Sequence, residues 1–262
     1  MSDIKFVEYN GVQHEVEQDY LYLCGIGIED ISEIKNLDKL HNLEELILDY
    51  NNITKITGLE NLKNLKGLSL VGNGISIIEG LEELKNLRYL KLGDGYNHAG
   101  NKIKKIEGLD ELSNLGGLDL GFNEISEING LSSLHSLEFL DLSYNKINEV
   151  KNLSNLKRLI ELNLSFNQIQ DMSRLRDFPK IKRLFLYGNQ IRVVNGLEDF
   201  DSLDELNLAN NPIVKIENYD NLKYLLTLEI DAKKLPSSEY AKFASYFRRG
   251  RYGDYLPRKT RL

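Results

Sequence analysis

Two aspartates, Asp119 and Asp141, lie 22 residues apart, each within the same short sequence, Leu-Asp-Leu. Two carboxylates held side by side can serve as a general acid and a general base. The sequence contains no nucleophile motif, phosphate-binding glycine loop or zinc-ligand spacing to accompany these aspartates or the histidines. The histidines are His14, His41, His98 and His135. Because aspartate is common at this point of a pattern that repeats along the chain, we interpret the pair as surface residues and predict that the protein is not an enzyme.

Metal and thiol chemistry have one candidate each. Asp94, Asn97 and His98 offer oxygen and nitrogen ligands, but their spacing matches neither a zinc nor a calcium site. We therefore predict no metal, no cofactor and no small-molecule substrate. The single cysteine, Cys24, stands where other repeats have a core leucine, so we predict a small buried apolar side chain.

The repeated pattern is clearest at residues 137–147, which read LEFLDLSYNKI, or L-x-x-L-x-L-x-x-N-x-I. Copies begin at Leu43, Leu65, Leu87, Leu115, Leu137, Leu159, Ile181 and Leu203. The spacing is 22 residues except after Leu87, where six extra residues, 95–100, are inserted. A fixed period of this length with this pattern predicts a leucine-rich repeat solenoid, and insertions in such repeats form loops on one face. We consider this loop a candidate partner contact.

Each repeat position, counted from the first leucine, has a predicted role. Alternate side chains of a strand point to opposite faces, so positions 4 and 6 face the core and positions 3, 5 and 7 face a concave surface. The asparagine at position 9 should be buried, where its amide satisfies backbone groups. The aromatic residues at position 8, Tyr50, Phe122, Tyr144 and Phe166, are interpreted as packing where the strand ends.

A second recurring position lies seven residues after each asparagine. It holds Gly or Asn in most repeats, which predicts a left-handed backbone there. Arg174 is the exception, and we expect it to carry strain or to adopt another turn. The other members are Gly58, Gly80, Gly108, Gly130, Asn152, Gly196 and Asn218.

Both ends should be capped, since an open solenoid exposes apolar core and an unpaired strand edge. Asn10-Gly11 between two β-prone runs predicts a hairpin. The first repeat is degenerate, with Leu21 at its first position. Pro236 and two serines predict the start of a helix that ends at Gly250 and buries Tyr240, Phe243, Ala244 and Phe247. The predicted parts are a hairpin cap (1–20), the solenoid (21–234), and a capping helix with a basic tail (235–262).

The 262 residues carry a net charge of −7, which argues against a surface devoted to nucleic acid. Residues 248–262 differ, with six basic groups and one acid. We interpret this tail as a solvated end, a second partner contact, or an arm that touches nucleic acid or membrane. The start, MSDIKFVEYN, has no apolar leader, and no apolar run is long enough to span a membrane. We expect a cytoplasmic, or nuclear, monomer kept reduced.

The repeat unit resembles one known class. The sequence NKINEVKNLSNLKRLIELNLSFNQI, residues 145–169, resembles the 22-residue leucine-rich repeats of the regulatory subunits of protein phosphatase 1 and of bacterial internalins. The resemblance covers roughly residues 21–231. It implies an α/β solenoid with a curved parallel sheet on the concave face, short 3-10 or irregular segments on the convex face, and a protein partner held on the concave face. The hairpin cap, the insertion and the basic tail depart from the class pattern.

Aromatic side chains and an arginine at concave positions have no core role. Such residues commonly dominate interface energetics, and nearby carboxylates would favour a basic partner. The predicted partner-binding residues are Glu45, Tyr89, Lys91, Asp119, Phe139, Asp141, Glu161, Arg183, Phe185 and Tyr187.

These observations favour a non-enzymatic module that binds a protein on its concave sheet, as a scaffold or as a regulator of an enzyme such as a phosphatase or GTPase. A structural component of a ribonucleoprotein, with the basic tail near RNA, is one alternative. A secreted internalin-like adhesin is another, although it would need a signal sequence.

Overall fold

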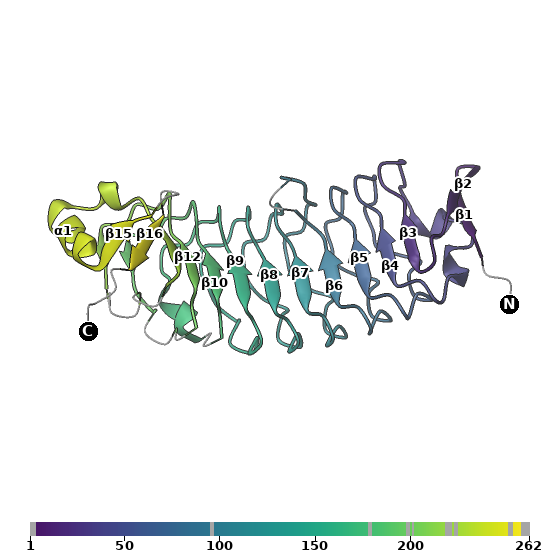
Figure 1. Ribbon diagram of the computed structural model, residues 1–262. Coiled ribbons are helices and arrows are strands. Elements are labelled where there is room, and N and C mark those ends of the chain that lie inside the picture. Colours follow the sequence, from purple (N-terminus) through teal and green to yellow (C-terminus); the bar gives the residue numbers. More distant parts are fainter. Residues whose placement is uncertain are drawn as a thin grey trace.

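The computed structural model describes residues 4–94, 97–177, 180–197, 200, 202–217, 222, 225–250 and 254–257. The chain forms an elongated solenoid in which one short strand from each repeat joins a single long sheet (Figure 1). The ten parallel strands are β3 (Tyr20–Tyr22), β4 (Glu45–Ile47), β5 (Gly67–Ser69), β6 (Tyr89–Lys91), β7 (Gly117–Asp119), β8 (Phe139–Asp141), β9 (Glu161–Asn163), β10 (Arg183–Phe185), β12 (Glu205–Asn207) and β14 (Thr227–Glu229). The predicted fold is therefore confirmed.

The strands are in register, and this register aligns equivalent repeat positions. Leu118 of β7 pairs with Leu90 of β6 and with Leu140 of β8, and all three side chains are buried. Because the central residue of every strand points the same way, the leucines form one continuous core along the solenoid. Positions 3 and 5 consequently face the opposite side of the sheet, the concave face.

The asparagine at position 9 connects neighbouring repeats, as predicted. Asn145 accepts a hydrogen bond from the backbone N–H of Ile125 at 2.8 Å and donates to the carbonyls of Leu120 and Leu142 at 3.0 and 3.1 Å. It is 8% exposed. Its amide therefore satisfies backbone groups of two repeats where the chain leaves the sheet and ladder bonding ends.

The predicted left-handed position is also confirmed. Gly108 has φ of 68°, and a Cβ atom there would lie 2.2 Å from the carbonyl oxygen of Ile78 in the preceding repeat. Arg174 adopts another turn, the 3-10 helix η3 (Ser173–Asp177). Asn218 lies outside the described residues.

The segments on the other side of the core are short. Besides η3 they include the 3-10 helices η1 (Ile31–Glu33), η2 (Leu37–Lys39) and η5 (Ala232–Lys234). Strands β11 (Val193–Val194) and β13 (Lys215–Ile216) pair in parallel there. Among the described residues, no helix is long and apolar enough to cross a lipid bilayer.

The N-terminal hairpin consists of β1 (Phe6–Tyr9) and β2 (Val12–Glu15). Asn10 and Gly11 both have positive φ, 48° and 77°, as a type I′ turn requires. The buried Tyr9 hydroxyl donates to the carbonyl of Gly27 at 3.2 Å and accepts from the N–H of Glu29 at 3.3 Å. The hairpin therefore packs against the first repeat at one end of the solenoid (Figure 1).

The predicted alignment of the first repeat was wrong by three residues. Leu21 pairs with Leu46 of β4, so it occupies position 4 and not position 1. Cys24 is half-buried rather than a core residue, because it alternates with the buried Leu23 and faces the other way. Strand β3 also begins at Tyr20, one residue before the predicted boundary.

The C-terminal cap begins as predicted but continues differently. Helix α1 (Ser237–Tyr246) buries Phe243, but it ends four residues before Gly250. The prediction was wrong for Tyr240, which is 41% exposed. The chain then forms β15 (Phe247–Arg249), which pairs with β16 (Tyr255–Pro257), and β16 pairs antiparallel with β14. Phe247 is buried as predicted, but from a strand.

Candidate functional site

The concave face consists of two main rows of side chains. Row 3 is formed by Tyr20, Glu45, Gly67, Tyr89, Gly117, Phe139, Glu161, Arg183, Glu205 and Thr227. Row 5 is formed by Tyr22, Ile47, Ser69, Lys91, Asp119, Asp141, Asn163, Phe185, Asn207 and Glu229. Nine of the ten predicted partner-binding residues belong to these rows. Tyr187, the tenth, lies two residues after β10.

The predicted concave aromatics differ in exposure. Tyr89 is 58% exposed and Phe139 is 39% exposed. Phe185 and Tyr187 are half-buried and therefore offer less surface to a partner. Of the four predicted concave aromatics, the two most exposed therefore lie near the middle of the sheet, on β6 and β8.

The two charges at Glu161 and Arg183 neutralise each other. Arg183 Nε donates to Glu161 Oε2 at 2.5 Å across neighbouring strands. Burial and the charge of Glu229 raise the pKa of Glu205, the next residue of row 3, whereas Arg183 lowers it. The arginine thus has acidic neighbours on both sides and is less free to bind a partner than its sequence position indicates.

Asp119 and Asp141 lie next to each other, as their spacing predicts. Asp119 accepts a hydrogen bond from the Gly121 N–H at 2.9 Å. Asp141 accepts from the N–H and hydroxyl of Ser143 at 2.7 and 2.6 Å and from Asn163 Nδ2 at 2.8 Å.

Burial separates these two carboxylates from bulk water. It raises the pKa of Asp119 to about 7, with a further contribution from the charge of Asp141. Burial also raises the pKa of Asp141, while its hydrogen bonds to Ser143 and Asn163 oppose the increase. A raised pKa can accompany acid–base catalysis. Among the described residues, however, the further groups that a catalytic site requires do not lie beside this pair.

Two aromatic residues of the concave face were missed because the first repeat was misaligned. Tyr20 begins row 3 and Tyr22 begins row 5, and Tyr22 is 60% exposed. Alternation of apolar and aromatic residues in Tyr20-Leu21-Tyr22-Leu23 was the signal that could have placed them correctly.

A line of rings in contact with one another runs along the edge where the strands end. His98, Phe122, Tyr144, Phe166 and Tyr187 form it, with successive centroids 4.2 to 5.4 Å apart. The prediction that position 8 aromatics pack at this edge is correct in outline. However, the rings pack on one another and remain partly exposed, and the three position 8 members have φ of 52° to 56°.

The inserted loop contributes one ring to this line. His98 stacks on Phe122 at 5.4 Å, and Asp94 accepts a hydrogen bond from the Asn97 N–H at 3.1 Å. Among the described residues, no three His, Cys, Asp or Glu side chains gather as metal ligands do. Gly95 and Tyr96, and Arg251, Arg258, Lys259 and Arg261 of the basic tail, lie outside the described residues.

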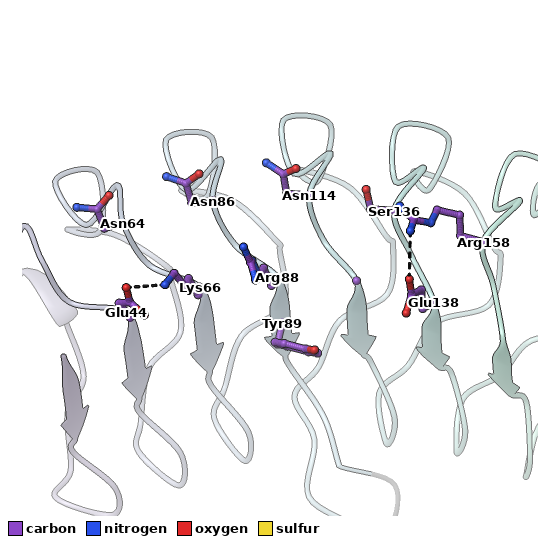
Figure 2. Close-up of a pocket in the computed structure, with 11 residues that line it drawn as sticks. Glu44, Asn64, Lys66, Asn86, Arg88, Tyr89, Asn114, Ser136, Glu138 and Arg158 are labelled. Carbon is purple, nitrogen blue, oxygen red and sulfur yellow. Dashed lines mark ion pairs between the residues drawn. The ribbon is translucent and has the colours of Figure 1, made fainter.

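A polar hollow of about 550 Å³ follows the opposite edge, where the strands begin (Figure 2). Asn64, Asn86 and Asn114 donate there to carbonyls of the preceding repeat at 2.8 to 2.9 Å. Two ion pairs, Glu44–Lys66 and Glu138–Arg158, cross it, and Arg88 lies between them (Figure 2). The asparagines fix successive turns, so we assign this edge a structural role.

The repeats also match a known family. The family described as "Leucine Rich repeats (2 copies)" matches residues 63–111 and 135–177. Together with the solenoid fold, this match makes the chain a leucine-rich repeat protein. No curated protein matches the sequence. Leucine-rich repeats are protein-interaction modules in general, and no catalytic family is indicated.

Solved structures with the same fold include bacterial proteins. An internalin (inlF) of Listeria monocytogenes is 27% identical with a TM-score of 0.62, covering 84% of this chain and 76% of that one. Internalin C2 of the same organism is 27% identical with a TM-score of 0.61, covering 81% and 80%. A leucine-rich repeat protein of Leptospira interrogans is 28% identical with a TM-score of 0.69, covering 80% and 54%.

Proposed function

We propose that this protein binds a protein partner on its concave sheet and acts as a non-enzymatic scaffold or as a regulator of an enzyme. The observation that carries the proposal is the exposure of Tyr89 and Phe139 at the centre of row 3. Large aromatic side chains placed centrally in an interface commonly supply much of its binding free energy. We also propose a cytoplasmic location.

The experiment is capture of partners from cytosol by the immobilised protein, followed by mass spectrometry. Wild type is compared with a Tyr89/Phe139/Phe185 triple alanine variant. The matched control is Ile77→Ala, since Ile77 is 50% exposed but follows β5 and lies off the sheet. A partner held by wild type and by the control, but lost by the triple variant, is expected.

The result that would overturn this proposal is equal capture of every partner by the triple variant and wild type. Thermal unfolding of the three proteins provides the necessary control for folding. Tyr89 and Phe139 are exposed, and Phe185 is partly buried on the concave face and not in the core. The triple variant should therefore melt close to wild type. A large decrease would mean that the rings support the fold.

A second candidate function is that of a secreted, internalin-like adhesin. The specific observation in its favour is the similarity to two Listeria internalins over more than four fifths of this chain. Fractionation of the source cells separates the two candidates. Protein found in the medium or at the cell surface would favour the adhesin, and protein confined to the cytosol would favour the intracellular scaffold.

A further inference from the structure

A hollow of about 250 Å³ lies on the concave face over β6, β7 and β8. The rings of Tyr89 and Phe139 line it from row 3, and the carboxylates of Asp119 and Asp141 line it from row 5. It therefore combines two apolar walls with two acidic groups in one small space.

Gly117 is the reason that the hollow exists. It lies in row 3 between Tyr89 and Phe139 and brings no side chain to the surface. A Cβ atom at this position would lie 2.8 Å from Cδ1 of Tyr89, so the tyrosine ring leans over the glycine. Any larger residue would displace the ring and occupy the space between the two walls.

The charge of the two aspartates is not needed for the fold. Asp119 accepts a hydrogen bond from the N–H two residues later, and so does Asp141. Asn163 and Asn207, which are neutral, make the same bond in the same row, at 3.0 and 3.1 Å. An asparagine thus supports the same backbone turn, although at position 141 it would lose the hydrogen bond that Asn163 donates to Oδ2. The turn therefore does not explain why both residues are acidic.

The charges around the hollow favour a cation. Lys91 is the one base among the residues that line the hollow, against the three acids Asp119, Asp141 and Glu161. Asp94 adds a further negative charge near Asp119. Glu161 also lines the hollow but is already paired with Arg183. Two adjacent, partly desolvated carboxylates repel each other, and a bound cation would relieve that repulsion.

We propose that this hollow receives an arginine side chain of the protein partner, with the guanidinium between the rings of Tyr89 and Phe139 and hydrogen-bonded to the carboxylates of Asp119 and Asp141. A guanidinium is planar, stacks on aromatic faces, and matches carboxylates with its fork of donors. This inference rests on the proposed function, because it names the chemistry that a partner would present to the concave face.

A peptide probe tests the site without an identified partner. Selectively ¹⁵N-glycine-labelled protein is titrated at pH 8 with N-acetyl-Gly-Arg-Gly-amide, and with the same peptide carrying neutral citrulline. The amides of Gly117, in the hollow, and Gly121, which donates to Asp119, are the reporters. We expect both to shift with the arginine peptide and the citrulline peptide to bind at least about tenfold more weakly.

Three variants complete the experiment. Asp119→Asn with Asp141→Asn should weaken the arginine peptide at least about tenfold, and Tyr89→Ala, which removes one wall but no charge, should weaken it severalfold. Glu229→Gln, a distant change in row 5, should bind as wild type does. The proposal is overturned if the arginine peptide fails to bind, if citrulline binds equally well, or if the aspartate variant keeps full affinity.

The outcome remains distinct from that of the capture experiment. If the peptide fails but capture depends on Tyr89 and Phe139, concave binding stands and the arginine pocket does not. If the peptide binds but no captured partner depends on these residues, the pocket stands and the proposed partner face does not.

Discussion

Asn163 donates a hydrogen bond of 2.8 Å from Nδ2 to Oδ2 of Asp141 in the preceding repeat. Asn207 makes a similar lateral bond, of 2.7 Å, to Glu229 in the following repeat. Polar side chains of row 5 thus interact across strands as well as along them. Asp119, in contrast, lies beside the carboxylate of Asp141, so its neighbour repels its charge.

This difference leads to a prediction for Asp119→Asn. The pKa of Asp119 is raised to about 7 in the folded protein, against about 3.9 in an unfolded chain. Between these values only the folded state holds the proton, so stability falls as pH rises through this window. The variant does not lose stability in this way. Its free energy of unfolding should exceed that of wild type by up to about 4 kcal/mol at pH 8.

Urea unfolding at pH 4 and at pH 8 checks the prediction. The advantage of Asp119→Asn should shrink toward pH 4, where the folded wild-type carboxyl is protonated and the unfolded one is about half protonated. Asp110→Asn is a suitable control because Asp110 is exposed. A difference from wild type that does not change with pH would contradict the raised pKa.

Asn145→Ala should be strongly destabilising. It removes an amide that bonds with Ile125, Leu120 and Leu142 and leaves buried backbone groups without partners, each at a cost of about 1–3 kcal/mol. We expect a total loss of about 3 kcal/mol or more in urea unfolding. Asn148→Ala, at an exposed position three residues later, should change stability little.

Gly108→Ala should also destabilise the protein, by about 1–3 kcal/mol. The new methyl group would lie 2.2 Å from the carbonyl oxygen of Ile78, and φ is 68°. Gly116→Ala is the matched control, because the nearest atom to its methyl group would be 3.7 Å away. Equal melting temperatures for the two variants would show that the backbone at Gly108 can move freely.

Tyr9→Phe tests the N-terminal cap. It removes a hydroxyl that bonds to Gly27 and Glu29, which should cost about 1 kcal/mol. Hydrogen exchange should accelerate in the hairpin and the first repeat while the repeats near Leu140 keep their protection, since each repeat contacts only its neighbours. Uniform acceleration along the solenoid would instead indicate a single cooperative unit.

The regular repeats could be predicted because their pattern is redundant. An error at one position is corrected by seven other copies, so Asn145 and Gly108 were assigned correct roles from spacing alone. The first repeat lacks this protection, because Ile26 stands where the others have asparagine. Without that asparagine the leucines fit two alignments. The alignment with Leu21 at position 1 leaves Tyr20 and Tyr22 off the concave face.

The candidate site was predictable as a set of positions but not as a set of contacts. Alternation placed Tyr89, Phe139 and Arg183 on the concave face correctly. Alternation could not indicate that Glu161 forms an ion pair with Arg183, because this contact depends on the side-chain rotamers of two neighbouring strands. Alternation also could not predict the hollow over Gly117, because the hollow exists where glycine has no side chain.

The antiparallel strands at the C-terminal end have a consequence for behaviour at high concentration. β15 is the last strand in the sheet, and it exposes two adjacent cations, Arg248 and Arg249. An unpaired strand edge is a template for pairing with another chain, and basic side chains on that edge oppose it through repulsion. Repulsion between these arginines would therefore oppose end-to-end pairing of two solenoids.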